Sequence, residues 1–261
     1  MATDIDIVDR RDKELQVLSS KGFASMTELV QLLSVSESTV RRDLETLEGQ
    51  GVVRRTHGGA VLIKDSAGHR MAFNERQTTA TAQKQAIAQA VAAMIPLNQT
   101  VLLDGGTTCY QVAKAIRGKR LNVITNSVPI ASLLATDLEP EVTLIGGYVY
   151  PRTGVTLGAT AQRMLADVHA SQLVLSCAAI GPEGAFNANQ MMVDVERAMM
   201  QAADQVILAV DSSKLGTRAV VRLCDLNELD AIVTDAQASD QARQWLAKLS
   251  IKVLYAELAS E

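Results

Sequence analysis

The spacing of apolar residues divides the chain into two regions. In the first fifty residues apolar positions recur every three to four residues, which predicts three short helices. These helices cover about residues 8–20, 25–33 and 36–49. In the third helix Val40, Leu44 and Leu47 form one apolar stripe, and Ser36 is a residue type that caps helix starts. From Thr100 onward, short β-branched runs alternate with helical stretches, so strands and helices are expected to alternate there.

Residues 52–63 are predicted to form a short basic hairpin after the third helix, with Gly58-Gly59 at its tip. A helix that opens with hydroxyl and arginine side chains and runs into such a hairpin is typical of a winged helix-turn-helix. In that arrangement the helix enters the DNA major groove and the wing lies against the phosphate backbone. The predicted DNA contacts are Ser36, Ser38, Thr39, Arg41 and Arg42 on the helix and Arg54, Arg55 and His57 on the wing.

The rest of the chain predicts an α/β domain with a mainly parallel sheet that is covered on both faces. Residues 64–75 lack periodicity and are expected to be a linker, and a long helix is expected over about 77–95. The expected strands are 100–103, 122–125, 141–145, 172–177, 205–210, 219–223, 231–234 and 251–255. The expected domains are therefore a DNA-binding domain at 1–63, the linker at 64–75 and an α/β domain at 76–261.

The most polar and glycine-rich segments of the second region follow its predicted strands. In open α/β sheets ligands bind beyond the carboxyl ends of the strands, and parallel strands bring those ends to one edge. Free backbone N–H groups at a glycine-rich turn, together with hydroxyl and lysine side chains, suit a phosphate group. The expected ligand contacts are Asp104, Gly105, Gly106, Thr107, Thr108, Thr125, Asn126, Ser127, Gly146, Gly147, Arg152 and Lys214.

Each of these segments also has a purely structural interpretation. Gly-Gly-Thr-Thr is neither a Walker loop nor a dinucleotide-binding fingerprint, and a tight turn with a capping threonine explains it as well. Lys214 alone fits an exposed surface equally well. Asp194 and Glu196 are placed where acids stabilise a helix start, and that interpretation is favoured over a ligand contact. For Cys109 a small packed residue is favoured over a redox role.

Composition narrows the function classes. Aromatic residues make up only 3% of the 261 residues, so platforms for stacking single-stranded nucleic acid are not expected. The net charge is -4, and the DNA argument therefore depends on the arginine pairs at 41–42 and 54–55. The three cysteines lack metal-ligand spacing, so no metal, cofactor or catalytic residue is predicted. The N-terminus is polar and no apolar run could span a bilayer, which predicts a cytoplasmic protein without a membrane partner.

Six segments of the chain carry a resemblance to a known family. They are SVSESTVRRDLETLEGQGVVRRTHGGAV, QKQAIAQAV, LLDGGTTCYQVA, VITNSVPIA, LIGGYV and VDSSKLG. In this order they resemble the DeoR-type bacterial transcription regulators over nearly the whole chain. The sequence departs from the family pattern at Gly105, where serine is common, and at Cys109, where a third threonine is common, which leaves the identity of the ligand open.

The resemblance implies an N-terminal winged helix-turn-helix and a C-terminal effector domain similar to the ribose-5-phosphate isomerase and coenzyme A transferase-like fold. It implies a repressor of a sugar or carbohydrate catabolic operon whose binding to double-stranded operator DNA responds to a phosphorylated metabolite. Because one small winged domain rarely binds tightly, a homo-oligomer, a dimer or tetramer, is expected. An alternative is a sugar-phosphate isomerase or transferase using Asp104, Glu196 and Lys214. A third interpretation is a DNA-binding protein that responds to no metabolite, but it leaves the polar segments at the strand ends unexplained.

Overall fold

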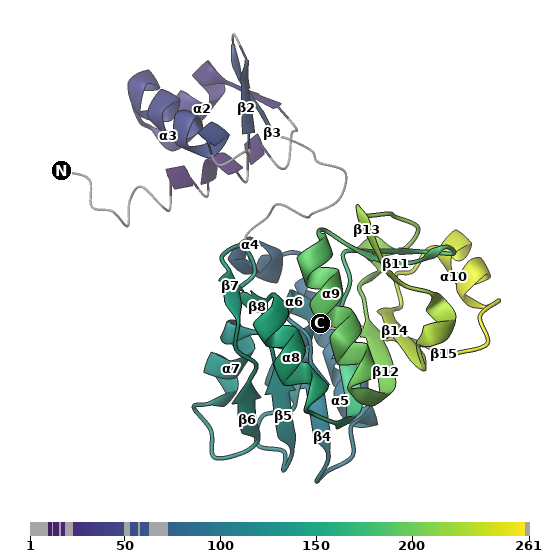
Figure 1. Cartoon of the computed structure of the whole chain (residues 1–261). Coiled ribbons are helices and arrows are strands. Elements are labelled where there is room, and N and C mark those ends of the chain that lie inside the picture. Colours follow the sequence, from purple (N-terminus) through teal and green to yellow (C-terminus); the bar gives the residue numbers. More distant parts are fainter. Residues whose placement is uncertain are drawn as a thin grey trace. The chain divides into compact units, whose positions relative to one another are not determined.

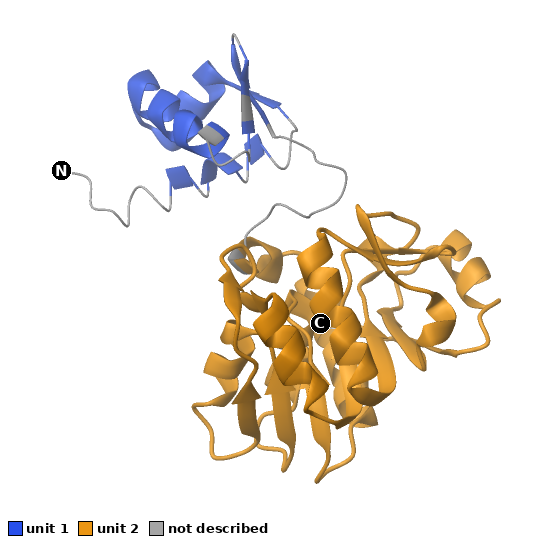
Figure 2. Cartoon of the chain, viewed as in Figure 1, with its two compact units in different colours: residues 1–66 blue, residues 67–261 orange. Residues whose placement is uncertain are grey.

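The structure is a computed structural model that describes residues 10–11, 13–15, 17–18, 23–49, 53–56, 58–62 and 73–258. The chain divides into two compact units, residues 1–66 and 67–261 (Figure 2). Each unit has a hydrophobic core of its own: one cluster of buried side chains forms the core of the first unit, and two clusters line the sheet of the second.

The first unit packs helices on a small antiparallel sheet (Figure 1). The described residues between 10 and 18 are helical. The further elements are β1 (Phe23–Ser25), α2 (Met26–Leu33), α3 (Glu37–Gly49), β2 (Val53–Thr56) and β3 (Gly59–Leu62), with strand order β1-β3-β2. Val40, Leu44 and Leu47 are buried in the core, which confirms the apolar stripe predicted for the third helix. The hydroxyl of Ser25 accepts from the Glu28 N–H at 3.2 Å and caps α2, as the sequence indicates.

The second glycine of the predicted wing tip belongs to a strand. Thr56 pairs with Gly59 across the hairpin, so Gly59 is part of β3, and Gly58 lies in the turn. Strand β1, which the sequence did not reveal, pairs with β3 on its other side. A Cβ atom on Gly59 would lie 2.1 Å from the carbonyl oxygen of Ala24 in β1. This glycine is therefore needed for strand packing and not for the turn.

The second unit is built around a seven-stranded sheet in which every neighbouring pair is parallel. Its order is β15-β14-β12-β9-β4-β5-β6. The strands are β4 (Thr100–Leu103), β5 (Asn122–Thr125), β6 (Glu141–Leu144), β9 (Ala170–Leu175), β12 (Ala203–Ala209), β14 (Ala231–Asp235) and β15 (Lys252–Ala256). The prediction of a mainly parallel sheet is confirmed.

Helices cover both faces of this sheet, because its buried strands send alternate apolar side chains to opposite sides. Val101 and Leu103 join the core cluster under one set of helices, while Leu102 joins the cluster under the other set. The first set is α5 (Thr81–Met94), α6 (Thr107–Ala115) and α7 (Val128–Leu134). The second set is α8 (Ala159–Ala166), α9 (Gln190–Gln201) and α10 (Asp240–Leu246), of which α8 and α9 lie side by side in Figure 1.

The strand order reverses direction between β4 and β9. From β4 the chain continues outward through β5 and β6, whereas β9 leads the other way through β12, β14 and β15. The helix that follows β4 is α6, on one face, and the helix that follows β9 is α9, on the other. The loops after these two neighbouring strands therefore lead to opposite faces of the sheet. Open α/β sheets bind their ligands at such a switch point.

Several strands lie outside the parallel sheet. A hairpin is formed by β7 (Tyr148–Tyr150) and β8 (Val155–Leu157), and a small antiparallel sheet by β10 (Ala179–Gly181), β11 (Gly184–Asn187) and β13 (Val221–Cys224). The predicted strand at 219–223 is thus a strand, but it belongs to the small sheet. Two short 3-10 helices, Ser212–Lys214 and Leu226–Glu228, complete the unit.

Most of the predicted linker, residues 64–72, lies outside the described residues. Its last three residues are helical and begin α4 (Phe73–Thr78). The single helix predicted from 77 to 95 is divided between α4 and α5, because Ala80 adopts a left-handed conformation with φ 51°. Phe73 is buried, and its ring meets that of Tyr110 on α6 edge-on at 5.5 Å. Helix α4 is therefore part of the second unit.

Candidate functional sites

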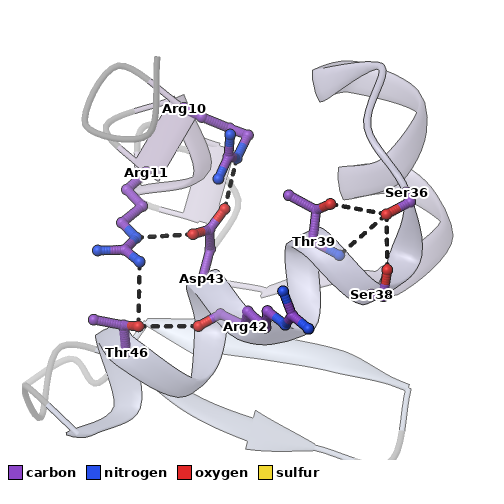
Figure 3. A network of polar contacts seen from close by, with 8 residues as sticks. All are labelled: Arg10, Arg11, Ser36, Ser38, Thr39, Arg42, Asp43 and Thr46. Carbon is purple, nitrogen blue, oxygen red and sulfur yellow. Dashed lines mark hydrogen bonds and ion pairs between the residues drawn. The ribbon is translucent and has the colours of Figure 1, made fainter. Parts of the chain in front are cut away.

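The start of α3 presents a cluster of hydroxyl groups (Figure 3). The Ser36 oxygen accepts from the Thr39 N–H at 3.2 Å, which confirms it as the helix cap. It also lies 2.9 Å from the Ser38 oxygen and 2.8 Å from that of Thr39. This network holds the first turn of α3 in place. Ser36 and Ser38 are exposed and Thr39 is half-buried, so the cluster can meet DNA in the way a recognition helix does.

The two arginines of α3 differ in their surroundings. The Arg41 guanidinium pairs with Glu37 one turn earlier at 2.8 Å, and both side chains are exposed. Such a surface pair is worth about 0.5 kcal/mol, so it gives way easily to a stronger acceptor. Figure 3 shows the Arg42 side chain pointing away from the arginine–aspartate network beside it. It is exposed and ready to reach a base edge or a phosphate.

Asp43 ties α3 to the first helical segment of the chain. Its buried carboxylate accepts from Arg10 Nε at 2.6 Å and from Arg11 Nε at 2.9 Å, and Arg11 also donates to Thr46 (Figure 3). Nearby, burial and the Asp43 charge raise the pKa of the Glu14 carboxyl to about 8. In the Arg-Arg-Asp-Leu segment, Asp43 and Leu44 therefore serve the fold, while the arginines face outward.

The wing is held to α3 by Arg55. Its Nε donates to Glu48 at 2.8 Å and its Nη1 to Glu45 at 2.7 Å, and its backbone N–H also donates to Glu48. These bonds raise the pKa of Arg55 and lower that of Glu48. An arginine engaged by two carboxylates is a positioning group first and a phosphate contact second. His57 and the side chain of Arg54, also predicted as wing contacts, lie outside the described residues.

At the strand ends of the second unit, Asp104 joins the two loops of the switch point. Its buried carboxylate accepts from the Ser176 hydroxyl at 2.6 Å and from the Ser176 N–H at 3.1 Å. Ser176 follows β9, so the bond spans the point where the sheet changes direction. Burial raises the pKa of Asp104, and the bonds from Ser176 oppose that shift.

The two glycines after Asp104 are explained by packing. A Cβ atom on Gly105 would lie 2.0 Å from Val155 Cγ1, and one on Gly106 would lie 2.4 Å from Ser176 Oγ. In the structure these glycines let β8 and the loop after β9 approach the turn closely. Thr107 and Thr108 then begin α6 as buried residues, and the Thr108 hydroxyl lacks a hydrogen-bond partner among the described residues.

The three residues of the Thr-Asn-Ser segment after β5 have different roles. Thr125 donates to the Leu103 carbonyl at 2.7 Å, and Ser127 accepts from the Ile130 N–H at 3.4 Å and caps α7 as predicted. Asn126 donates to Thr156 O at 3.3 Å, and its own Oδ1 is buried and unsatisfied within the described residues. Asn126 is thus the member with an atom free for a ligand.

Gly146 and Gly147 lie in the turn between β6 and β7. The Gly146 N–H points at Met164 Sδ, 3.2 Å away on α8. Gly147 has φ 144°, and a Cβ atom there would lie 2.7 Å from the Leu157 carbonyl oxygen. Gly147 therefore has a structural reason, whereas a Cβ atom on Gly146 would meet Met164 Sδ at an ordinary 3.4 Å.

Lys214 reaches from the end of β12 back to β9. Its Nζ donates to the Cys177 carbonyl at 3.0 Å and lies 3.8 Å from the Asp211 carboxylate. The Ser212 N–H in turn donates to Asp235 at the end of β14, at 2.7 Å. The loops after β4, β9, β12 and β14 therefore meet along one edge of the sheet, and those after β4 and β12 are two of the polar segments singled out in the sequence.

Three charged residues near this edge were missed or set aside by the sequence analysis. Arg76 comes from α4, Lys84 from α5 and Glu196 from the middle of α9. The charges of Asp104 and Arg152 act on Arg76, and those of Asp211 and Lys214 act on Lys84. Glu196 is buried, accepts from Asn187 and feels the charge of Asp104; burial raises its pKa well above the ordinary value. Glu196 thus stands within the polar cluster and does not serve a helix start.

We call this set of side chains the strand-end cluster. It comprises the cations Arg76, Lys84, Arg152 and Lys214, the acids Asp104, Glu196 and Asp211, and the polar residues Thr108, Asn126 and Thr153. Burial raises the pKa of two of the acids, which favours their neutral forms, and it lowers the pKa of Lys84 only to about 8. With four cationic and three acidic side chains, the cluster holds more positive than negative groups.

A hollow elsewhere in the second unit is lined by charged groups that are already paired with one another. It is lined by residues of α9, β13 and their neighbours, among them Arg197, Arg222, Asp225 and Glu228. Arg197 donates to the Leu223 and Arg222 carbonyls, Arg222 pairs with Asp225, and Glu228 accepts from the Asp225 N–H. Because these charged groups satisfy one another, we place the candidate ligand site at the strand ends.

Cysteine and metal chemistry find little support in the described part of the chain. The thiol of Cys109 is buried and donates to Val174 O at 3.6 Å, and burial raises its pKa well above the ordinary value, which disfavours a reactive thiolate. Burial also raises the pKa of Cys177 and Cys224 to about 12. Among the described residues no group of three or more metal-ligating side chains is found, and none of their helices is long and apolar enough to cross a membrane.

Comparison with known proteins places both units in one family. Residues 10–66 match the DeoR-like helix-turn-helix domain, and residues 79–236 match the DeoR C terminal sensor domain. The chain is 35% identical to the HTH-type transcriptional repressor CsqR of Escherichia coli, over 87% of each chain. It is 31% identical to the Glycerol-3-phosphate regulon repressor of Escherichia coli, over 87% of this chain and 90% of that one. Ribose 5 phosphate isomerase A from Neisseria gonorrhoeae is similar at 14% identity, covering 52% of this chain and 53% of that one, with a TM-score of 0.39.

The two regions thus define a DNA-binding transcriptional regulator with a separate sensor domain. The chain belongs to the DeoR family, and it is a transcriptional repressor of that family rather than an enzyme. The isomerase alternative is thereby set aside, and the DNA-binding interpretation of the first sixty residues is confirmed.

Proposed function

We propose that this repressor controls a sugar or carbohydrate operon and that a phosphorylated sugar or related metabolite, bound at the strand-end cluster, modulates its affinity for the operator. The observation that carries the proposal is the charge of the cluster: cations from α4, α5 and the β12 loop meet at the switch point of the sheet. A phosphate group supplies the missing negative charge, and sugar hydroxyls suit the unsatisfied polar atoms. One relative is named for a glycerol-3-phosphate regulon, which supports the same ligand class.

For the ligand contacts we propose the predicted set with its roles divided. Asp104, Thr107, Thr108, Asn126, Arg152 and Lys214 face the ligand in this account. Gly105, Gly106, Thr125, Ser127, Gly146 and Gly147 shape the loops that carry them. The neutral form of Glu196 can donate a hydrogen bond to a sugar oxygen, because a protonated carboxyl is a donor.

For the operator contacts we propose that Ser36, Ser38, Thr39, Arg41 and Arg42 enter the major groove. Arg54, Arg55 and His57 are proposed to hold the phosphate backbone. The exposed position of Arg42 and the loosely paired state of Arg41 support this assignment. A bidentate contact from an arginine to a guanine is worth about 1–3 kcal/mol.

We further propose that the protein acts in the cytoplasm as a homo-oligomer, a dimer or tetramer. Its domains in this account are residues 1–63 for DNA, 64–75 as the connection and 76–261 as the sensor. Two-fold symmetric binding doubles the contacts on a two-fold operator. A ligand then changes DNA affinity only if it binds the DNA-competent and incompetent arrangements with different affinity.

The test of the proposed function starts from thermal unfolding of the full chain with a panel of phosphorylated sugars and their unphosphorylated counterparts. A ligand that binds the native state raises the melting temperature, so we expect stabilisation by one or more phosphorylated members and none by the free sugars. Equal stabilisation by a sugar and its phosphate, or none by any member, would contradict the proposal.

A further inference from the structure

Arg76 is the cation of the strand-end cluster whose side chain has buried atoms without an acceptor in the described part of the chain. Its Nε and Nη2 atoms are buried and have no hydrogen-bond partner among the described residues. A guanidinium taken out of water without a partner is costly, and proteins normally bury it only with hydrogen bonds to an anion. The charge of Asp104 acts on Arg76, and that carboxylate is itself occupied by two bonds from Ser176. Arg76 therefore lacks the partner that its burial demands.

The two unsatisfied atoms lie on the same edge of the guanidinium. The N–H bonds of Nε and Nη2 are parallel, and this edge matches two oxygen atoms of a carboxylate or a phosphate. Two further polar atoms of the strand-end cluster are buried and unsatisfied among the described residues: Thr108 Oγ1 in the first turn of α6 and Thr153 Oγ1 in the turn between β7 and β8. The positive charge of Arg152 also acts on Arg76 and disfavours its charged state until an anion arrives.

Helix α4, which carries Arg76, is fastened to the strand-end cluster at both ends. At its start the Phe73 N–H donates to the Arg152 carbonyl at 3.0 Å, and the Phe73 ring packs on Tyr110. At its end Lys84 Nζ donates to the carbonyls of Arg76 and Thr79, at 2.7 Å and 2.6 Å. Helix α4 is also the first described element after the wing strand β3. A ligand that orders or shifts α4 thus acts on the segment of chain that leads to the DNA-binding unit.

Building on the proposed function, we propose that Arg76 binds the phosphate of the metabolite through Nε and Nη2 and that this contact fixes helix α4, which makes Arg76 the residue that couples the ligand to the DNA-binding unit. The ligand class is a phosphate monoester with two negative oxygen atoms free to accept the bidentate pair. The sequence could not show this, because Arg76 lies near the predicted linker and far from every glycine-rich loop.

The test compares wild-type protein with Arg76→Met, Arg76→Lys and the control Arg163→Gln, all as the full chain. Arg163 is an exposed arginine on α8 that donates only weakly, at 3.5 Å, to Thr160. Calorimetric titration with glycerol 3-phosphate and with inorganic phosphate measures affinity. Hydrogen exchange of residues 73–78 measures the order of α4.

We expect Arg163→Gln to bind like the wild type, Arg76→Met to lose about tenfold or more in affinity, and Arg76→Lys to fall between them because lysine is a point charge. Phosphate should slow exchange in α4 of the wild type and leave Arg76→Met unchanged. Without ligand, Arg76→Met should melt at the wild-type temperature or above, because a buried charge without a partner has been removed.

Three results would overturn the role of Arg76: wild-type affinity in Arg76→Met, exchange in α4 that ignores the ligand in the wild type, or a lower melting temperature of Arg76→Met without ligand. The last would show that the arginine serves the fold. If the wild type binds neither probe while a phosphorylated sugar from the panel stabilises it, the phosphate contact proposed for Arg76 is also rejected. If no phosphorylated compound stabilises the wild type, the proposed function itself fails.

Discussion

In the winged helix-turn-helix, arginines that support the fold have carboxylate partners: Arg10 and Arg11 hold Asp43, and Arg55 holds Glu45 and Glu48. At the strand ends of the second unit, Arg76 has two buried donors without an acceptor in the described part of the chain, and Lys84 donates to the backbone carbonyls of Arg76 and Thr79. The difference teaches what each region is built for. The first unit pairs its supporting arginines with its own carboxylates and offers exposed groups to DNA, whereas the second holds charge that a ligand would balance.

The largest effect is expected from breaking the completed network of the first unit with Asp43→Ala. This change leaves Arg10 and Arg11 without their acceptor and should destabilise the first unit by about 2–3 kcal/mol. Hydrogen exchange of α3 measures the loss, and binding to a duplex selected by the wild type from a random-sequence pool should weaken in parallel. Glycerol 3-phosphate binding serves as the internal control. A variant that keeps wild-type exchange in α3 would show that the network is dispensable.

The second effect separates the outward-facing arginines from the supporting one. Arg42→Ala should weaken binding to the selected duplex by about 2 kcal/mol and leave the melting temperature unchanged, because the side chain is exposed. Arg55→Ala should affect DNA binding less and loosen the wing, because its guanidinium is engaged by Glu45 and Glu48. Fluorescence anisotropy gives the affinities. A larger loss of DNA affinity in Arg55→Ala than in Arg42→Ala would contradict this division of roles.

A third, smaller effect concerns pH in the second unit. Burial lowers the pKa of Lys84 from 10.5 to about 8, so in the folded protein without ligand its charge is present below about pH 8 and is lost above it. Affinity for glycerol 3-phosphate, which is a dianion throughout this range, should fall several-fold between pH 7 and pH 9.5. Calorimetry at the two pH values checks this. In Lys84→Met the dependence should disappear, and a dependence that survives unchanged would assign it to another group.

A fourth effect concerns pH in the first unit. Because burial raises the pKa of Glu14 from 4.5 to about 8, the folded state holds its proton between these values while the unfolded state releases it. The stability that this proton contributes is full below pH 4.5 and is lost as the pH rises toward 8. Glu14→Gln should match the wild type near pH 5 and exceed it at pH 8, where the wild type has lost the contribution of the bound proton. Exchange of α3 amides at both pH values measures this, and equal stabilities at pH 8 would refute it.

Local patterns allowed most of the fold to be predicted. Val40, Leu44 and Leu47 are close in sequence and share one helix face, so their periodicity predicts α3. The residue type of Ser36 predicts the cap at its start. Strong apolar runs predicted all seven strands of the parallel sheet. The short antiparallel strands such as β7 and β10 have three residues each, too few for a period to show. Ala80, a good helix former, gave no signal that α4 and α5 part there.

The candidate site was predictable only in part, because its members come from distant segments. Asp104 and Lys214 follow strong strands, and the rule for parallel sheets brings them to one edge. Arg76 and Glu196 reach the same place from helices whose sequences carry no motif. Their positions depend on how α4 and α9 pack, which is set by tertiary contacts such as that of Phe73 with Tyr110. For Gly105 and Gly106 the sequence did offer a motif, that of a phosphate-binding turn, but the structure also explains both glycines by packing.

The most direct test of the account measures binding of the full chain to its selected duplex, with and without the phosphorylated sugar that stabilises it best, in the wild type and in Lys214→Ala. The account predicts that the sugar phosphate changes the DNA affinity of the wild type at least tenfold. It predicts that Lys214→Ala binds the duplex normally but no longer responds. DNA binding that ignores the sugar phosphate in the wild type, or a full response in Lys214→Ala, would contradict a ligand site at the strand ends.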